Sequence, residues 1–176
     1  FNNTLACNYS GIYLLEGNNS LVEDNNVTCY AEGAPAAGFQ LYKTYDNLFK
    51  NNWLYSPNGG TIYSGASNVA NNTFINITGI SNSGNGLVLG GFNNTMINST
   101  GISNSSNGIN VADYNNTLIN SIGTSNFSAG ILITGENNLL INPIATGNMS
   151  GSYGIEFNSG ANNTIRDCVN ISGYSS

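Results

Sequence analysis

A short asparagine-rich motif recurs at a fixed interval in this chain and limits what the chain can fold into. Its clearest copies begin at Asn71 (NNTFIN), Asn93 (NNTMIN), Asn115 (NNTLIN), Asn137 (NNLLIN) and Asn162. The first four are 22 residues apart and the fifth follows after 25, while less regular counterparts begin at Asn2, Asn18 and Asp46. One short motif with a period of about 20 to 30 residues is typical of a solenoid, in which each repeat contacts its neighbours.

Each repeat contains short segments in which apolar residues alternate with polar or small ones. One is the motif itself, and another is a Gly followed by alternating apolar residues, as in GLVL (86–89), GINV (108–111), GILI (130–133) and GIEF (154–157). A weaker third segment lies between them, as in ITGIS (77–81). Alternation with a period of two, bounded by Gly and Asn, is typical of strands. Three short strands per repeat predict an all-β fold, a right-handed parallel β-helix of about seven or eight coils spaced about 4.8 Å apart.

The whole chain is predicted to be one β-helix domain, residues 1–176. Residues 1–70 should form irregular coils with an aromatic-rich insertion, 71–168 regular coils of 22 to 25 residues, and 169–176 the C-terminal end. No signal peptide, initiator methionine or tag is visible, which is what we expect of a mature or excised segment.

The columns of the motif predict which side chains fill the core. The fourth position is large and apolar in each copy: Leu5, Leu21, Phe49, Phe74, Met96, Leu118, Leu140 and Ile165. The fifth position admits Lys50 and Arg166, so it should point outward and the fourth inward. By strand parity the sixth should also point inward. Inward asparagines can bond one another along the axis, so we predict an inner ladder of Asn51, Asn76, Asn98, Asn120 and Asn142, ended by Asp167.

Charge and composition exclude several classes of function. The chain has 3 Lys+Arg against 9 Asp+Glu, no His, and a formal net charge of −6. Binding to nucleic acid or to an anionic membrane relies on Lys and Arg, so we expect neither. No apolar run approaches the roughly 18 residues that a membrane span needs.

Asparagine is the most unusual component, with 35 copies, and N-x-[ST] sequons occur fourteen times. Together with the low charge, they favour an extracellular or cell-surface location and predict glycans. An inward sixth position would exclude glycans from Asn76 and Asn98. The candidate glycosylation sites are therefore the turn and loop positions Asn8, Asn26, Asn71, Asn93 and Asn115.

The combined string, as in GLVLGGFNNTMIN (86–98) and GINVADYNNTLIN (108–120), resembles the parallel β-helix repeat proteins. These include the NosD-like group and the carbohydrate-binding and sugar-hydrolase (CASH) domains, which are abundant in archaeal surface proteins. The resemblance covers 71–168 well and 1–70 loosely. It implies the fold but not a function, because the family spans lyases, epimerases, binding modules and structural surface proteins. A chain without His offers no copper cluster of the kind that the NosD-like members imply.

Catalytic groups are scarce. The only cations are Lys43, Lys50 and Arg166, and the acids are scattered. Sugar-cleaving β-helix enzymes generally cluster acids beside a group that moves a proton, and Ser-His or Cys-His catalysis is excluded without His. We expect no enzyme, no catalytic residue and no cofactor. A Ca²⁺ contact between Asp113 and Glu136 in successive coils is the one metal hypothesis, and solvated turn acids are the simpler interpretation.

Two surface features remain as candidates. Outward positions three and five form a Thr/Ile stripe, the candidate assembly face, made of Thr73, Ile75, Thr95, Ile97, Thr117, Ile119, Leu139 and Ile141. A flat uncharged stripe marks an interaction surface, and it also resembles the ice-binding face of antifreeze β-helices. The aromatic-rich segment 30–67 supplies candidate sugar or partner contacts at Tyr42, Tyr45, Trp53 and Tyr55. Alternatively, these aromatics simply fill a larger coil.

The cysteines leave two arrangements open. Cys7 and Cys29 lie in adjacent coils and could bridge within the chain, which leaves Cys168 free. Alternatively, Cys168 joins the first coils of a neighbouring subunit.

The leading hypothesis is a non-enzymatic extracellular structural protein, a subunit of a cell-surface layer, sheath or filament. It would form a homo-oligomer or polymer through its coil ends and the Thr/Ile stripe. The alternatives are a carbohydrate-binding module or adhesin, a fragment of a polysaccharide lyase or epimerase, and an ice-binding protein.

Overall fold

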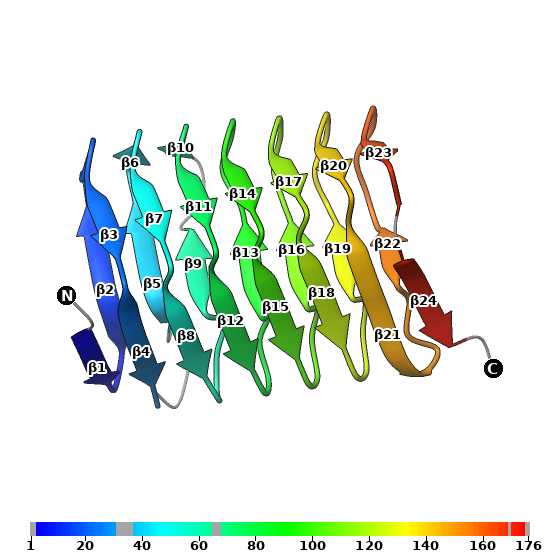
Figure 1. Ribbon diagram of the computed structural model, residues 1–176, viewed down its shortest axis with the longest axis horizontal. Coiled ribbons are helices and arrows are strands. Elements are labelled where there is room, and N and C mark those ends of the chain that lie inside the picture. The colour runs from blue at the N-terminus through cyan, green and yellow to red at the C-terminus, as the bar shows by residue number, and fades with distance from the viewer. Residues whose placement is uncertain (1–2, 31–36, 65–67, 169, 175–176) are drawn as a thin grey trace.

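The computed structural model describes residues 3–30, 37–64, 68–168 and 170–174, and every regular element among them is a β-strand. Neighbouring strands run parallel in each sheet. The strands stack coil upon coil into a rod of about seven coils, with the two ends of the chain at opposite ends of the rod (Figure 1). The predicted all-β parallel β-helix is therefore confirmed.

Three long faces run along this rod. The Asn-motif sheet consists of β3 (Leu21–Glu23), β7 (Leu48–Lys50), β11 (Thr73–Ile75), β14 (Thr95–Ile97), β17 (Thr117–Ile119), β20 (Leu139–Ile141) and β23 (Thr164–Arg166). The Gly-Ser sheet consists of β1 (Asn3–Cys7), β4 (Asn25–Cys29), β8 (Trp53–Ser56), β12 (Thr78–Ser81), β15 (Thr100–Ser103), β18 (Ile122–Ser125), β21 (Ile144–Ser150) and β24 (Asn170–Tyr174).

The third face is built from two shorter sheets. They are β2 (Ser10–Leu15), β5 (Ala37–Tyr42) and β9 (Ile62–Ser64), and then β13 (Leu87–Leu89), β16 (Ile109–Val111), β19 (Ile131–Ile133) and β22 (Ile155–Phe157). A backbone hydrogen bond from Thr61 N to Asn85 O, 3.4 Å, joins the two. A minor pair, β6 (Thr44–Tyr45) and β10 (Val69–Ala70), lies between the third face and the Asn-motif sheet.

The core lies between the faces and follows the predicted columns. Phe49, Phe74, Met96, Leu118 and Leu140, all at the fourth position of the motif, are buried and stack in register. The rings of Phe49 and Phe74 stack with their centroids 4.7 Å apart. The fourth position is thus the inward one, as predicted.

Upstream, the predicted frame is wrong by one residue. Val22, and not Leu21, pairs with Phe49, because the left-handed residue that opens this copy is Asn19. Leu5 lies in the Gly-Ser sheet opposite Val27, so it belongs to another column. The counterpart proposed at Asn2 lies outside the described residues.

The inward orientation predicted for the ladder is wrong, although the predicted bonds along the axis are present where Asn76 Nδ2 donates to Asn51 Oδ1 and Asn142 Nδ2 to Asn120 Oδ1, both at 3.0 Å. Four of its five members, Asn51, Asn76, Asn98 and Asn120, are exposed, and Asn142 is half-buried. All five have φ between 48° and 54°. A left-handed residue turns the chain from the Asn-motif sheet into the Gly-Ser sheet, so the alternation of sides that holds within a strand stops there. Asp167 has the same conformation, with φ 53°. These residues form an outer corner, and Asn76 and Asn98 are open to modification.

The inner ladder exists one strand earlier, at the second asparagine of each motif. Its members are Asn47, Asn72, Asn94, Asn116 and Asn138, all buried, with Asn163 half-buried at the end. From Asn72 onward, each Oδ1 accepts a hydrogen bond from the backbone amide of the ladder residue one coil earlier, at 2.8–3.0 Å, and Asn47 Oδ1 accepts from Ser20 N at 2.8 Å. The side-chain amides donate to carbonyl groups of the turns, for example Asn94 Nδ2 to Gly90 O at 2.8 Å. The ladder therefore satisfies backbone groups that the turn would otherwise leave unpaired.

Small inward residues bring the Gly-Ser sheet close to the third face. Gly79, Gly101 and Gly123 are in register and buried. A Cβ added to Gly101 would overlap the carbonyl oxygen of Gly108 on the third face. Glycine is required there because two backbones approach each other closely.

Candidate functional site

The Thr/Ile stripe forms one continuous outer face of the Asn-motif sheet. Strand pairing aligns Thr73 with Thr95 and Thr117, and Ile75 with Ile97 and Ile119. These side chains are half-buried, because each lies against its neighbours in the adjacent coils. Four coils thus present a flat surface of methyl groups and hydroxyls without a charge.

Charged residues mark the two ends of this stripe. In the column of Ile75, Glu23 and Lys50 occupy the first two coils and Arg166 the last. The uncharged part is therefore confined to the middle of the rod, in β11, β14, β17 and β20.

A second uncharged face lies on the Gly-Ser sheet, and sequence reasoning did not find it. Its outward residues alternate between Thr and Ile: Thr78, Ile80, Thr100, Ile102, Ile122, Thr124, Ile144 and Thr146. Ile102 is 38% exposed and Ile122 36% exposed, which makes them the most exposed isoleucines in the middle of the rod. No strand of this sheet contains a charged residue among the described residues. The repeated TGIS string carried the signal, since its Gly and Ser point inward and its Thr and Ile outward.

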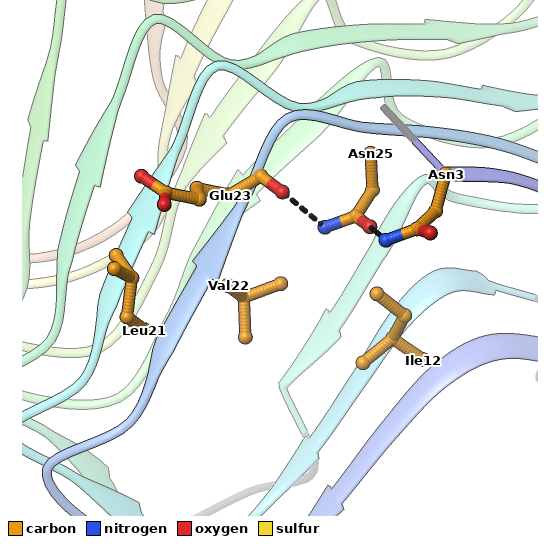
Figure 2. A pocket seen from close by; sticks show the side chains of 6 residues that line it. All are labelled: Asn3, Ile12, Leu21, Val22, Glu23 and Asn25. Carbon is orange, nitrogen blue, oxygen red and sulfur yellow. Dashed lines mark hydrogen bonds between the residues drawn. The ribbon is translucent and has the colours of Figure 1, made fainter. Parts of the chain in front are cut away.

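The first coil leaves a hollow at its end of the rod. A cavity of about 350 Å³ is lined by Asn3, Ile12, Leu21, Val22, Glu23 and Asn25 (Figure 2). Asn25 holds its rim, donating to Glu23 O at 3.0 Å and accepting from Asn3 Nδ2 at 3.1 Å. At the other end, Phe157 is 55% exposed and Ile171 45% exposed. Both ends therefore present apolar side chains.

The predicted aromatic contacts lie on two different faces. Trp53 and Tyr55 are outward neighbours on β8, with ring centroids 6.1 Å apart. Tyr42 ends β5 on the third face, and Tyr45 lies in β6. The structure therefore brings together the first two and not all four.

Two cavities lie beside exposed aromatics near the first coils. One, of about 260 Å³, is lined by Asn3, Thr4, Asp24, Asn25, Asn26, Asn51 and Trp53. The other, of about 360 Å³, is lined by Tyr9, Ser10, Tyr13 and Gln40. Amide, hydroxyl and carboxylate groups beside an aromatic ring can bond and stack on a sugar.

The ionisable groups are spread over the surface. Lys43 Nζ donates to Glu16 Oε1 at 2.9 Å, and this hydrogen bond and the carboxylate charge raise the pKa of the Lys43 ammonium. Asp113 Oδ2 accepts the backbone amide of Gly91 at 2.7 Å, which gives the carboxylate a structural partner. No group of three or more His, Cys, Asp or Glu that could hold a metal ion occurs in the described residues.

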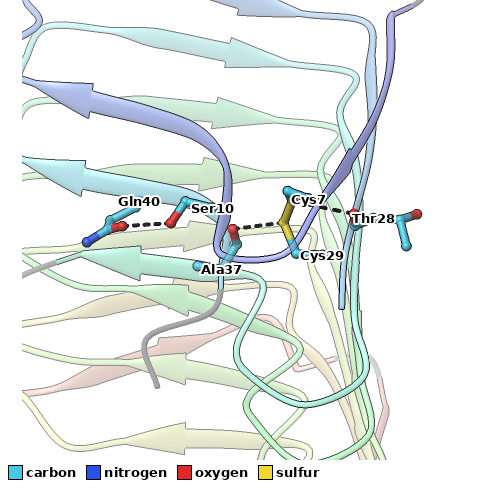
Figure 3. The surroundings of a disulfide bond; sticks show 6 residues. All are labelled: Cys7, Ser10, Thr28, Cys29, Ala37 and Gln40. Carbon is cyan, nitrogen blue, oxygen red and sulfur yellow. Dashed lines mark hydrogen bonds between the residues drawn. A yellow bond between two sulfur atoms is a disulfide. The ribbon is translucent and has the colours of Figure 1, made fainter. Parts of the chain in front are cut away.

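The cysteines follow the first of the two predicted arrangements. Cys7 and Cys29 are paired partners in β1 and β4 and are joined by a disulfide (Figure 3). Cys168 is a free, exposed thiol in the described part of the chain. It lies after β23, at the opposite end of the rod from the disulfide.

The sequon asparagines and the buried asparagines are two separate sets. Asn8, Asn26, Asn71, Asn93 and Asn115 are exposed. None of the buried asparagines begins a sequon, because in N-N-T the first asparagine is the acceptor and the second joins the ladder. Each candidate glycosylation site therefore lies where a glycan has room.

The described residues contain no helix with the length and apolar composition that crossing a membrane requires. A family sequence model described as a right handed beta helix region matches residues 2–100, more than half of the 176-residue chain. Neither a curated protein nor a solved structure matches the chain. The family match includes the irregular first coils, where the motif is weakest.

Proposed function

Since this chain belongs to the right-handed β-helix family, we propose that it is a non-enzymatic extracellular structural protein. It would serve as a subunit of a cell-surface layer, sheath or filament, and its rods would associate with one another. The observation that carries this proposal is the pair of uncharged Thr/Ile faces on the Asn-motif and Gly-Ser sheets. Flat, uncharged, partly apolar surfaces of this extent favour association with another protein surface. The finer resemblance to NosD-like, CASH and archaeal surface proteins stays a prediction.

The inner ladder supports a structural role. Buried asparagines, backbone groups and the described buried serines other than Ser56 are hydrogen-bonded, many of them from coil to coil, for example Ser99 N to Ser121 Oγ at 3.1 Å. A rod whose polar groups are paired in this way is stiff and offers few openings to a protease.

Side-by-side association through the Thr/Ile faces is the main route that we propose. Both faces lie in the middle of the rod, on strands that have a neighbour on each side, and they present uncharged side chains over four successive coils.

Electron microscopy of the purified chain tests this function. We expect ordered assemblies at high concentration, with and without reductant, because the faces do not depend on Cys168. The variant Ile97→Asp places a charge in the middle of the Thr/Ile stripe and should reduce assembly. A chain that stays monomeric at every concentration and binds glycans on an array would overturn the proposal.

Carbohydrate binding is the second candidate, favoured by the cavity that Trp53 and Asp24 line. A glycan hit should then quench Trp53 fluorescence and be lost in Trp53→Ala. A lyase or epimerase activity would need residues beyond those in this chain. Ice binding through either Thr/Ile face predicts thermal hysteresis in a monomeric protein.

A further inference from the structure

The outer face of the Gly-Ser sheet is complementary to itself. Six strands, β8, β12, β15, β18, β21 and β24, present two outward columns. Along the rod, the first column reads Trp53, Thr78, Thr100, Ile122, Ile144 and Asn170, and the second reads Tyr55, Ile80, Ile102, Thr124, Thr146 and Ser172. Between β15 and β18 the order of Thr and Ile within a strand reverses.

This reversal has a consequence for two copies placed face to face. Take a two-fold axis that lies in the interface, parallel to the strands, midway between β15 and β18. Each column of one copy then faces the same column of the other copy, running in the opposite direction. In the first column the opposed pairs are Trp53 with Asn170, Thr78 with Ile144, and Thr100 with Ile122. In the second column they are Tyr55 with Ser172, Ile80 with Thr146, and Ile102 with Thr124. In every pair a large side chain faces a smaller one. An isologous interface requires this kind of self-complementarity.

We infer that two copies of this chain pair antiparallel through the outer face of the Gly-Ser sheet. The inference rests on the proposed function, and it names the face and the geometry of one contact. A parallel arrangement fits less well, because Trp53 of one copy would then face Tyr55 of the other. Two bulky rings would hold the surfaces apart at one end, and Asn170 opposite Ser172 would leave a gap at the other.

The size of the face sets the strength of the contact. Six strands of about four residues span roughly 29 Å by 13 Å. Two such faces cover about 750 Å² together, which is the size of a weak, transient interface. No charged side chain has to be desolvated, since none occurs in these strands. We therefore expect a dissociation constant in the micromolar range.

Sedimentation velocity of the unglycosylated chain tests the face. The background variant is Cys168→Ser, which removes disulfide-linked dimers. The background should dimerise at tens of micromolar, and Ile102→Asp should raise the dissociation constant at least tenfold by burying a charge. Leu132→Asp is the matched control, because Leu132 is a half-buried outward aliphatic residue on the third face. Its dimer should be unchanged, and thermal unfolding should show that both variants are folded.

A charge-pair experiment tests the geometry. Thr124→Lys alone should also be monomeric, but an equimolar mixture with Ile102→Asp should form a heterodimer, since residue 102 of one copy faces residue 124 of the other. Thr146→Lys mixed with Ile102→Asp is the control and should not rescue, because Thr146 faces Ile80. Rescue by both lysine variants, or by neither, would overturn the antiparallel pairing.

The outcomes separate this inference from the proposed function. If the background associates and Ile102→Asp associates equally well while Ile97→Asp does not, the stripe is the contact and the inference is wrong. If the background stays monomeric at every concentration, the proposed self-association itself fails. Thermal hysteresis that Ile102→Asp abolishes would assign the face to ice and also overturn the inference.

Discussion

The side-chain oxygen of Asn94 accepts a hydrogen bond from the backbone amide of Asn72, one coil earlier, at 2.8 Å. The same residue donates to Val69 O and Gly90 O, at 3.0 and 2.8 Å. One buried side chain thus supplies the partner of two backbone groups, Asn72 N and Gly90 O, and a second partner of Val69 O, which also accepts from Phe92 N at 3.0 Å.

Replacing Asn94 by Ala should therefore destabilise the rod strongly. Two buried backbone groups, Asn72 N and Gly90 O, lose their partners, which costs roughly 2 to 5 kcal/mol of unfolding free energy. The matched control is Asn98→Gly at the outer corner, where φ is 49° and glycine is tolerated, so we expect a change of a few tenths of a kcal/mol. Guanidinium unfolding followed by circular dichroism measures both. If Asn98→Gly lost more unfolding free energy than Asn94→Ala, the outward orientation of Asn98 would be wrong and the inward one would be supported.

Glycan mapping checks the same orientation by an independent chemistry. In a host that attaches N-glycans, glycopeptide mass spectrometry should find occupancy at exposed sequons, with Asn98 among them. Asn94 begins no sequon, and it cannot serve as a buried control, because the substitution that would create a sequon there, Met96→Thr, disrupts the core. A complete lack of modification at both Asn76 and Asn98, beside full occupancy at Asn71 and Asn93, would contradict the open corner.

Gly101→Ala should destabilise the chain by about 1 to 3 kcal/mol, because the new methyl group overlaps the backbone of Gly108. Ala145 stands in the same column one coil after Gly123, so Ala145→Gly tests the reverse change. We expect a cost of about 1 kcal/mol there from added chain entropy. Thermal melts of the two variants compare the sites, and a neutral Gly101→Ala would show that the two faces are free to move apart.

Removing the Cys7–Cys29 disulfide should loosen the first coils. The bond closes a loop with a sequence separation of 22 residues, for which chain entropy gives about 3 kcal/mol. Cys7→Ser/Cys29→Ser should therefore lower protection from hydrogen exchange in β1, β2 and β4. Cys168→Ser is the control and should leave exchange unaffected. Equal protection with and without the disulfide would show that strand pairing alone holds the first coil.

The Lys43–Glu16 pair gives a prediction about pH. Because the pKa of Lys43 is raised above 10.5 in the folded chain, its contribution to stability is present at lower pH and is lost as the pH rises through the folded pKa. Both side chains are exposed, so the melting temperature should change little in Glu16→Gln at pH 7. An NMR titration should show the pKa of Lys43 falling in that variant. An unchanged titration would mean that the ion pair does not persist in solution.

Sequence reasoning captured the fold because a β-helix repeats its hydrophobic pattern in every coil. The 22-residue period, the strand segments and the core column of Phe74, Met96 and Leu118 all follow from that repetition. The ladder was misplaced because strand parity was carried past Ile75 into Asn76, where a left-handed residue ends the strand. Asparagine suits both a buried ladder and a left-handed corner, so residue type alone did not separate them.

The candidate surface was only half predictable. The Thr/Ile stripe was visible because its motif is strongly conserved in form from Thr73 to Ile141 within the chain. The outer face of the Gly-Ser sheet was missed because its inward residues are Gly and Ser, so the strands lack the alternation of apolar and polar residues that predicts a strand. Its self-complementarity depends on the register of six strands, from Trp53 to Ser172, and the chain's irregular spacing conceals that register.

The inner ladder also bears on how such a chain changes in length through duplication of its gene. Each ladder asparagine bonds within its own coil or to the coil directly before or after it. Duplicating a segment of 22 codons therefore inserts a complete coil whose bonds are the same as those it interrupts. Every such event lengthens the rod by about 4.8 Å and adds one row to each outer face. Selection can in this way adjust the length of the rod and the area of its outer faces in unit steps, without redesigning any part of the core.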